Sequence, residues 1–198
     1  MRVALLDYGA GNIHSLTKAL AVAGADVRVE PDPARCLDAD ALVLPGVGSF
    51  ARAAAHMAPA RRAIRDAILD GFPTIGVCLG MQLLFDHSDE GTGVGLGVIP
   101  GSVTRLDAPR VPQIGWNTID NVTDVAVERA ALRTAYYANG FACRPEDTSV
   151  VGAWSTHGVD RFPAVVRVKR AVGVQFHPEK SSTPGVQLLR ALLEECGA

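Results

Sequence analysis

The chain has 198 residues, of which 48% are apolar and 20% charged, and its formal net charge is −2. An apolar fraction of this size can build a substantial core and excludes disorder over most of the length. The near-neutral charge, with no long run of one sign, argues against nucleic-acid binding and against attraction to an anionic membrane.

The sequence carries no sign of export or of metal binding. No stretch reaches the roughly 18 consecutive apolar residues of a transmembrane helix, and the apolar run at the N-terminus is too short for a signal peptide. The four cysteines are scattered, without a CxxC pair or a histidine pair at metal spacing. We therefore expect a reduced, cytoplasmic protein that uses no metal and no cofactor.

The first 85 residues alternate between short apolar runs and segments of helical periodicity. The runs predict strands over residues 3–6, 27–29, 41–44 and 74–77. The periodic segments predict helices over residues 13–23, 50–69 (with a break near Pro59) and 79–85. This alternation is typical of parallel βαβ units, and strands that are apolar throughout fit a sheet covered on both faces.

The second half changes to short strands with one convincing helix, over residues 184–195. Strands are expected around Val98, Val103, Trp116, 136–137, 150–151, 165–168 and 172–175. Because no linker separates the halves, we expect a single domain over residues 1–198. The predicted fold class is α/β, with three layers: a mostly parallel, mixed sheet flanked by helices, flavodoxin-like, with an antiparallel section added to the doubly wound core.

One cysteine stands at a sharp strand-to-helix passage, in Gly76-Val77-Cys78-Leu79-Gly80. This G-x-nucleophile-x-G pattern is a nucleophile elbow with cysteine in place of serine. It places Cys78 near a helix N-terminus, whose dipole favours a thiolate, and leaves the Leu79 N–H beside a developing oxyanion. Alone the pattern is weak, since free cysteines are commonly inert core residues. Both interpretations stay open at this point.

A cysteine nucleophile needs a base, and His177 is the main candidate. It follows the apolar run 172–176, and the carboxylate of Glu179 can reach its imidazole. The alternative is an exposed turn in which Glu179 pairs with Lys180. His157, in a loop-like stretch, stays open as a second candidate. The other three histidines are expected on helix surfaces or too far along a helix from the thiol: His14, His56 and His87.

Taken together, six motifs resemble the class I (triad-type) glutamine amidotransferases. They are DYGAGN at 7–12, LPGVGSF at 44–50, VCLGMQLLF at 77–85, GLGVIPGSV at 95–103, GWN at 115–117 and QFHPEKSS at 175–182. The resemblance covers nearly the whole chain, and it is sharpest to glutaminase subunits that act in histidine biosynthesis. It implies a glutamine amidotransferase fold and a triad of Cys78, His177 and Glu179 that releases ammonia from glutamine through a thioester.

The resemblance also implies the rest of the site. Oxyanion donors would be the Leu79 N–H and an N–H at Val47 or Gly48, where a peptide flip would follow loading of a partner. Contacts to glutamine carry over to Gly46, Gln82, Glu90, Asn139, Gly140 and Phe141. For Gln82 and Glu90, a solvated helix face is the alternative.

A partner is implied as well: a (β/α)8-barrel cyclase that forms a heterodimer with this chain and receives ammonia through an internal channel. Four residues match docking positions of the family: Asn12, Trp116, Tyr136 and Lys180. Each has a plain alternative, respectively a turn former, a core residue, a sheet residue and a solvated charge.

Two places depart from the family pattern. Asn139, Gly140 and Phe141 replace a common His-Ser-Tyr, and Gln113 stands where histidine is common. If the family uses backbone atoms at the triplet, glutamine binding survives; if it uses side chains, recognition changes. Competing functions are the glutaminase of another amidotransferase, a stand-alone γ-glutamyl hydrolase, and a catalytically silent regulatory subunit.

Overall fold

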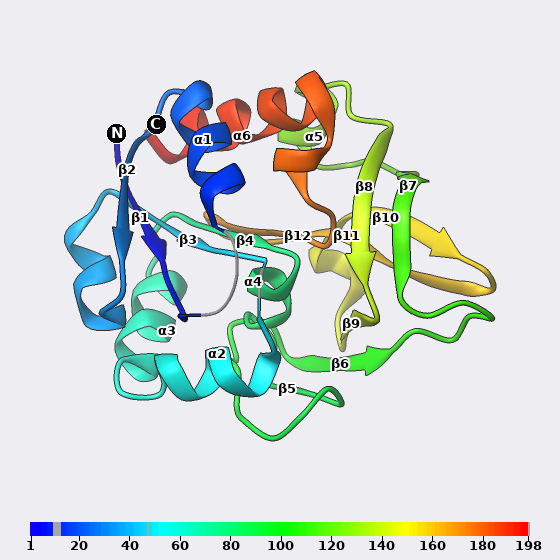
Figure 1. The fold of residues 1–198 in the computed structure, drawn as a ribbon, viewed down its shortest axis with the longest axis horizontal. Coiled ribbons are helices and arrows are strands. Elements are labelled where there is room, and N and C mark those ends of the chain that lie inside the picture. Colours follow the sequence, from blue (N-terminus) through cyan, green and yellow to red (C-terminus); the bar gives the residue numbers. More distant parts are fainter. Residues whose placement is uncertain (10–12, 47, 198) are drawn as a thin grey trace.

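The computed structural model describes residues 1–9, 13–46 and 48–197, and its centre is a twisted seven-stranded sheet (Figure 1). The parallel strands are β1 (Arg2–Leu6), β2 (Asp26–Glu30), β3 (Ala41–Leu44), β4 (Thr74–Val77) and β12 (Ala171–Val174). Two antiparallel strands extend the edge beyond β12, namely β11 (Asp160–Val168) and β10 (Val151–His157). The order across the sheet is β10-β11-β12-β4-β3-β1-β2, so the expected mixed sheet is confirmed.

Helices cover both faces of this sheet (Figure 1). On one face lie α1 (His14–Ala23), α5 (Val125–Arg129) and α6 (Ser182–Gly197). On the other lie α2 (Phe50–Met57), α3 (Arg61–Leu69) and α4 (Leu79–Gln82). Short 3₁₀ turns complete the connections: η1 (Pro33–Asp38), η2 (Thr148–Val150) and η3 (Pro178–Lys180).

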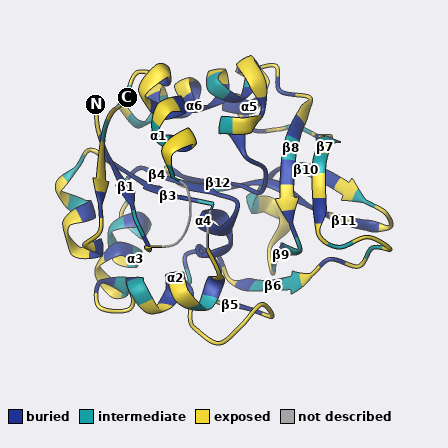
Figure 2. Cartoon of the chain, in the orientation of Figure 1, coloured by how far each residue is buried: buried dark blue, intermediate teal, exposed yellow. Residues whose placement is uncertain are grey.

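Alternate residues of each central strand enter opposite cores. In β1, Val3 and Leu5 pack under α1 and α6, whereas Ala4 and Leu6 pack toward α2 and α3. The strands are therefore buried on both faces, as Figure 2 shows, which is why their sequences are apolar without interruption. The predicted three-layer α/β architecture is confirmed.

The remaining strands form two smaller sheets beside the main one. One contains β5 (His87–Ser88), β6 (Gly101–Arg105) and β9 (Phe141–Pro145); the other is an antiparallel ribbon of β7 (Gln113–Thr118) and β8 (Thr134–Asn139). The strands expected near Val103, Trp116 and 136–137 thus exist, outside the main sheet.

Two expected elements differ in the structure. Val98 is buried but lies in no strand, because its N–H donates to the carbonyl of Leu84 in the turn after α4. The helix expected over 79–85 ends at Gln82, since the N–H groups of Leu84 and Phe85 bond three residues back and tighten the turn. The break near Pro59 is confirmed, because α2 ends at Met57 and α3 starts at Arg61. In the described part of the chain, no helix is both long and apolar enough to cross a bilayer.

Candidate active site

Cys78 lies at the junction of β4 and α4, in a backbone conformation that residues other than glycine rarely adopt. Its φ is 49° and its ψ is −102°, a geometry that costs about 1–3 kcal/mol for a residue other than glycine. Its N–H donates to the Val174 carbonyl at 2.7 Å, which ties the elbow to the end of β12. A Cβ at Gly80 would lie 2.0 Å from the Leu44 carbonyl oxygen, so glycine is required for α4 to pack on β3.

His177 and Glu179 form a buried pair. His177 Nδ1 lies 2.8 Å from Glu179 Oε1, and the two side chains are only 5% and 7% exposed. This contradicts the alternative of an exposed Glu179–Lys180 turn. Because Nδ1 is engaged by the carboxylate, Nε2 is the nitrogen left for another partner.

The geometry directs that imidazole to Cys78. A Cβ at Gly46 would lie 2.9 Å from Cys78 Cβ and 3.0 Å from His177 Cε1, so both side chains converge on the same point. Burial alone would lower the pKa of His177, but hydrogen bonds to Cys78 and Glu179 outweigh it and raise that pKa to about 10. The arrangement favours an imidazolium beside sulfur.

The other described histidines have different partners or places. His157, the second candidate from sequence, places Nε2 2.7 Å from the Arg110 carbonyl oxygen. His56 Nε2 makes a similar contact with the Pro31 carbonyl oxygen, also at 2.7 Å. His14 begins α1, and His87 is exposed in β5. Of the two candidates left open, the structure brings only His177 to the thiol.

A cavity of about 90 Å³ opens beside Cys78. Its lining includes every residue expected at the oxyanion hole or the glutamine side chain that the structure describes: Gly46, Gly48, Leu79, Gln82, Glu90, Asn139, Gly140 and Phe141. Val47, the other expected oxyanion donor, lies outside the described residues, as does the docking residue Asn12. Chain segments far apart in sequence thus surround one small space at the carboxyl end of the sheet.

Amide groups in the cavity wall have fixed orientations. The Phe141 carbonyl oxygen accepts hydrogen bonds from Asn139 Nδ2 at 3.0 Å and from Gln82 Nε2 at 3.2 Å. The buried Oδ1 of Asn139 has no partner among the described groups. Gln82 is 5% exposed, which contradicts the solvated-face alternative for it. Asn139 Oδ1 can therefore accept a hydrogen bond from a ligand.

Glu90 joins the cavity to α2. It lies in the turn after β5, not on a helix, and its Oε2 accepts the N–H of Phe50, the first residue of α2, at 2.9 Å. A carboxylate at this position complements the positive end of the helix dipole. Glu90 thus holds the segment that follows Gly48 against the cavity.

The comparison with known families decides what kind of protein this is. Residues 4–196 match the family described as "Glutamine amidotransferase class-I". The chain belongs to this family.

Similar proteins and solved structures of other chains agree with membership of this family. The chain is 39% identical to the imidazole glycerol phosphate synthase subunit HisH of Acaryochloris marina, over 99% of this chain and 95% of that one. It is 43% identical to the subunit of the same name from Nocardia farcinica, over 95% of each. A crystal structure of a glutamine amidotransferase, 21% identical, superposes with a TM-score of 0.78 over 99% of this chain and 100% of that one, which shows the fold.

Three of the docking residues expected in this amidotransferase form one cluster. Trp116 is 56% exposed, which contradicts the core alternative, and it pairs across the ribbon with Tyr136 at a ring separation of 6.3 Å. Lys180 Nζ lies 5.6 Å from the centre of the Tyr136 ring. The Tyr136 carbonyl accepts the His177 N–H at 2.8 Å, so this surface is bonded directly to the backbone of His177.

Two buried residues beside the Cys78–His177 pair are not identified by the sequence patterns. Gln175 Nε2 lies 3.5 Å from Cys78 Sγ, and Ser181 Oγ bridges the His177 carbonyl at 2.7 Å and the Tyr136 N–H at 2.9 Å. Both belong to the QFHPEKSS motif, which was the available signal. Their roles follow from contacts across the sheet, and sequence spacing does not reveal those contacts.

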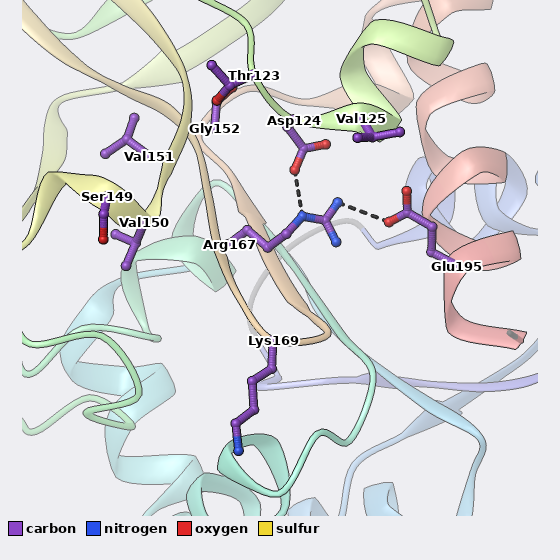
Figure 3. A pocket seen from close by; sticks show the side chains of 10 residues that line it. All are labelled: Thr123, Asp124, Val125, Ser149, Val150, Val151, Gly152, Arg167, Lys169 and Glu195. Carbon is purple, nitrogen blue, oxygen red and sulfur yellow. Dashed lines mark hydrogen bonds and ion pairs between the residues drawn. The ribbon is translucent and has the colours of Figure 1, made fainter.

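A larger hollow of about 560 Å³ lies elsewhere on this amidotransferase, around Arg167 (Figure 3). Arg167 Nε is 2.6 Å from Asp124 Oδ2 and its Nη2 is 3.0 Å from Glu195 Oε2. Asp124 also caps α5 through the Ala126 and Val127 N–H groups. Lys169 points away and donates to the Leu69 carbonyl. Arg167 is thus paired with two carboxylates and Lys169 is bonded to a backbone carbonyl, which makes the hollow a structural junction. Across residues 1–9, 13–46 and 48–197, no group of three His, Cys, Asp or Glu side chains could hold a metal ion.

Proposed function

We propose that this amidotransferase is the glutaminase subunit of an imidazole glycerol phosphate synthase. The convergence of Cys78 and of the His177–Glu179 pair on Gly46 carries the chemical part of the proposal. Similarity over nearly the full length to subunits of that name supports the assignment within the family.

The first half of the reaction forms a thioester. The Cys78 thiolate attacks the side-chain amide carbon of glutamine, and the carbonyl oxygen takes up the negative charge. The tetrahedral intermediate collapses as the His177 imidazolium gives its proton to the departing nitrogen, which leaves as ammonia. Glu179, bonded to Nδ1, keeps Nε2 aimed at the sulfur and stabilises the charged ring.

The second half restores the enzyme. Neutral His177 takes a proton from water, and the hydroxide attacks the thioester carbon. Glutamate leaves, and the Cys78 sulfur is released as a thiolate beside the imidazolium. The balance is glutamine plus water giving glutamate, ammonia and the proton that the new carboxyl group releases.

The cavity wall supplies the remaining groups. Leu79 is the first residue of α4, so its N–H has no acceptor within the helix and can hold the oxyanion. A second donor would come from the turn at Val47 and Gly48. Glu90 suits the α-ammonium of glutamine because it is the carboxylate in the lining. The neutral Oδ1 of Asn139 suits a further donor, so the departure from His-Ser-Tyr preserves a polar wall.

The partner would be a (β/α)8-barrel cyclase that receives the ammonia through an internal channel. It combines ammonia with a ribulosyl-carboxamide nucleotide to yield imidazole glycerol phosphate and aminoimidazole carboxamide ribotide. The exposed Trp116, with Tyr136 and Lys180 beside it, offers an aromatic and cationic docking surface adjacent to His177. Free cysteines that include the nucleophile favour a reducing, cytoplasmic setting.

The decisive experiment measures ammonia release from glutamine by the purified chain alone, with the cyclase, and with the cyclase and its nucleotide ligand. We expect low release alone and strong stimulation by the loaded partner. Ammonia release at the same rate with and without the partner would instead identify a stand-alone hydrolase. No release under any condition would identify a silent regulatory subunit.

A further inference from the structure

A chain of side-chain amides leads from the cavity wall to the nucleophile. It begins at the Phe141 carbonyl oxygen, which can only accept hydrogen bonds. Gln82 must therefore turn its amide nitrogen toward Phe141, at 3.2 Å. This contact assigns the orientation of the Gln82 amide, which the shape of the side chain alone leaves ambiguous.

The second N–H of Gln82 fixes the next amide. Gln82 Nε2 lies 3.3 Å from Gln175 Oε1, so the Gln175 oxygen faces Gln82 and its nitrogen faces the opposite way. That nitrogen lies 3.5 Å from Cys78 Sγ, within the range of an N–H···S hydrogen bond. Gln175 is completely buried, and its backbone N–H donates to the Ala164 carbonyl at 2.9 Å. The side chain has little freedom to move away from the sulfur.

We propose that Gln175 is a catalytic residue of this glutaminase: its Nε2–H donates to the Cys78 sulfur and stabilises the thiolate, with the direction of the bond set by Gln82. The inference rests on the proposed role of Cys78 as nucleophile. His177 approaches the same sulfur, so the buried thiolate has two donors in place of water.

The bond also has a directional role. A thiolate held by Gln175 and His177 keeps a remaining lone pair for the substrate carbon. As the thioester forms, charge leaves the sulfur for the carbonyl oxygen, so the Gln175 contact weakens while the oxyanion contacts strengthen. Gln175 does not line the cavity and therefore acts on the nucleophile and not on bound glutamine.

His177 and Cys143 are titratable groups that interact with the Cys78 sulfur, and the Glu90 carboxylate lines the same cavity. His177 approaches the sulfur from beyond β12, with Glu179 behind the ring. Cys143 lies on β9, where burial, together with the nearby Cys78, raises the pKa of its thiol, so Cys143 stays neutral near pH 7. A changed ionisation of Cys78 in a Gln175 variant would therefore reflect the loss of the Gln175 side-chain amide.

The test compares Gln175→Met, which keeps the side-chain length without the donor, with Gln175→Glu, which keeps an acceptor for Gln82 and places a carboxylate at the sulfur. Gln187→Met, the same change at an exposed position of α6, is the matched control. The rate of Cys78 alkylation by iodoacetamide is followed by mass spectrometry from pH 5 to 10, with Cys78→Ala identifying reaction at other cysteines.

We expect the alkylation midpoint to rise by about one pH unit in Gln175→Met, with roughly tenfold slower alkylation below it, and to rise further in Gln175→Glu. Gln187→Met should match the unmodified chain. In the assembled synthase, both Gln175 variants should lower kcat and leave KM for glutamine near its original value. A folded Gln175→Met with an unchanged alkylation profile would overturn the proposal.

A measurement on the unsubstituted chain guards against a variant that does not fold. The Gln175 side-chain amide resonances should titrate with the same midpoint as Cys78 alkylation, whereas those of Gln187 should not. Gln175 resonances whose chemical shifts do not change around this midpoint would also overturn the proposal. Neither readout needs glutamine turnover, so a failed glutaminase assay and a failed Gln175 effect are separate results.

Discussion

The small cavity beside Cys78 and the large hollow beside Arg167 lie at opposite ends of the central strands. The first, of about 90 Å³, follows the carboxyl ends of β3 and β4. The second, of about 560 Å³, lies near the start of β12, where Arg167 pairs in register with Val172. Volume alone would favour the second as the functional site. The first is lined by the Cys78 thiol, which the His177–Glu179 pair approaches, and by Asn139, whose side-chain oxygen has no partner among the described groups.

The two places differ in whether their polar groups already have partners within the protein. Around Arg167, the guanidinium is paired with Asp124 and Glu195, so a ligand for this group would have to displace an existing ion pair. Beside Cys78, the internal hydrogen bonds orient the amides of Gln82 and Asn139 and leave Asn139 Oδ1 without a partner. In this molecule, the orientation of polar groups and not the volume of the hollow marks the functional end of the sheet.

Removal of the nucleophile is the strongest test of that contrast. Cys78→Ala in the assembled synthase should reduce the glutaminase activity by on the order of 10⁴-fold or more, because no thioester can form. The measurement is ammonia release under stimulated conditions, with circular dichroism to verify the fold. Turnover that persists in the folded variant would place the chemistry elsewhere.

Loss of the orienting carboxylate comes next. Glu179→Gln should lower kcat by roughly 10²- to 10⁴-fold, since the amide no longer stabilises the imidazolium. The pKa of His177 should fall from about 10, because Glu179 is one of the groups that raise it. Titration of the His177 ring resonances by NMR checks the shift; an unmoved titration would contradict the proposed pair.

The same pair predicts a pH dependence of stability. Folding raises the pKa of His177 from 6.5 to about 10, so the folded chain holds this proton more tightly than the unfolded chain. The stabilisation is complete below about pH 6.5 and is lost as the pH rises toward 10. Urea titrations across this window should show the decline, and Glu179→Gln should reduce it. A Glu179→Gln variant with the original slope would argue against the linkage.

Substitutions in the Arg167 hollow should lower the free energy of unfolding and leave the glutaminase activity unchanged. Arg167→Met leaves the buried Asp124 carboxylate without its cation and should cost about 2–3 kcal/mol of unfolding free energy. Arg129→Met, which breaks the exposed pair with Glu194, should cost less than about 1 kcal/mol. Urea denaturation measures both. A folded Arg167→Met that lost glutaminase would give the large hollow a functional role.

Ser181 supplies the smallest expected effect on the catalytic side. Ser181→Ala removes the acceptor for the Tyr136 N–H and a donor to the His177 carbonyl, and should cost about 1–2 kcal/mol. Ser149→Ala, where the hydroxyl contacts Asp147 at the surface, should change stability by less than about 0.5 kcal/mol. Equal losses in the two variants would show that the buried bridge adds nothing.

Much of the fold and of the proposed triad was accessible from local patterns. The uninterrupted apolar runs of β1, β3 and β4 and the Cys78 elbow depend on residues adjacent in sequence. The second half was harder: Val98 has the side chain of a strand residue, yet its backbone pairs with the turn after α4. The pairing of β6 with β9 joins distant segments that no short pattern connects. A single domain over residues 1–198 stays a prediction.

The sequence by itself determined the βαβ core, the strand-to-helix position of Cys78 and the spacing of His177 and Glu179, because these follow from residue type and neighbours. Only the tertiary structure decided that His177 and not His157 meets the thiol, that Trp116 is exposed, and that Gln175 directs an N–H at sulfur. The reason is physical. The direction of a buried amide is set by its acceptors, and those of Gln82 and Gln175 come from α4, β9 and the end of β12, which only folding brings together.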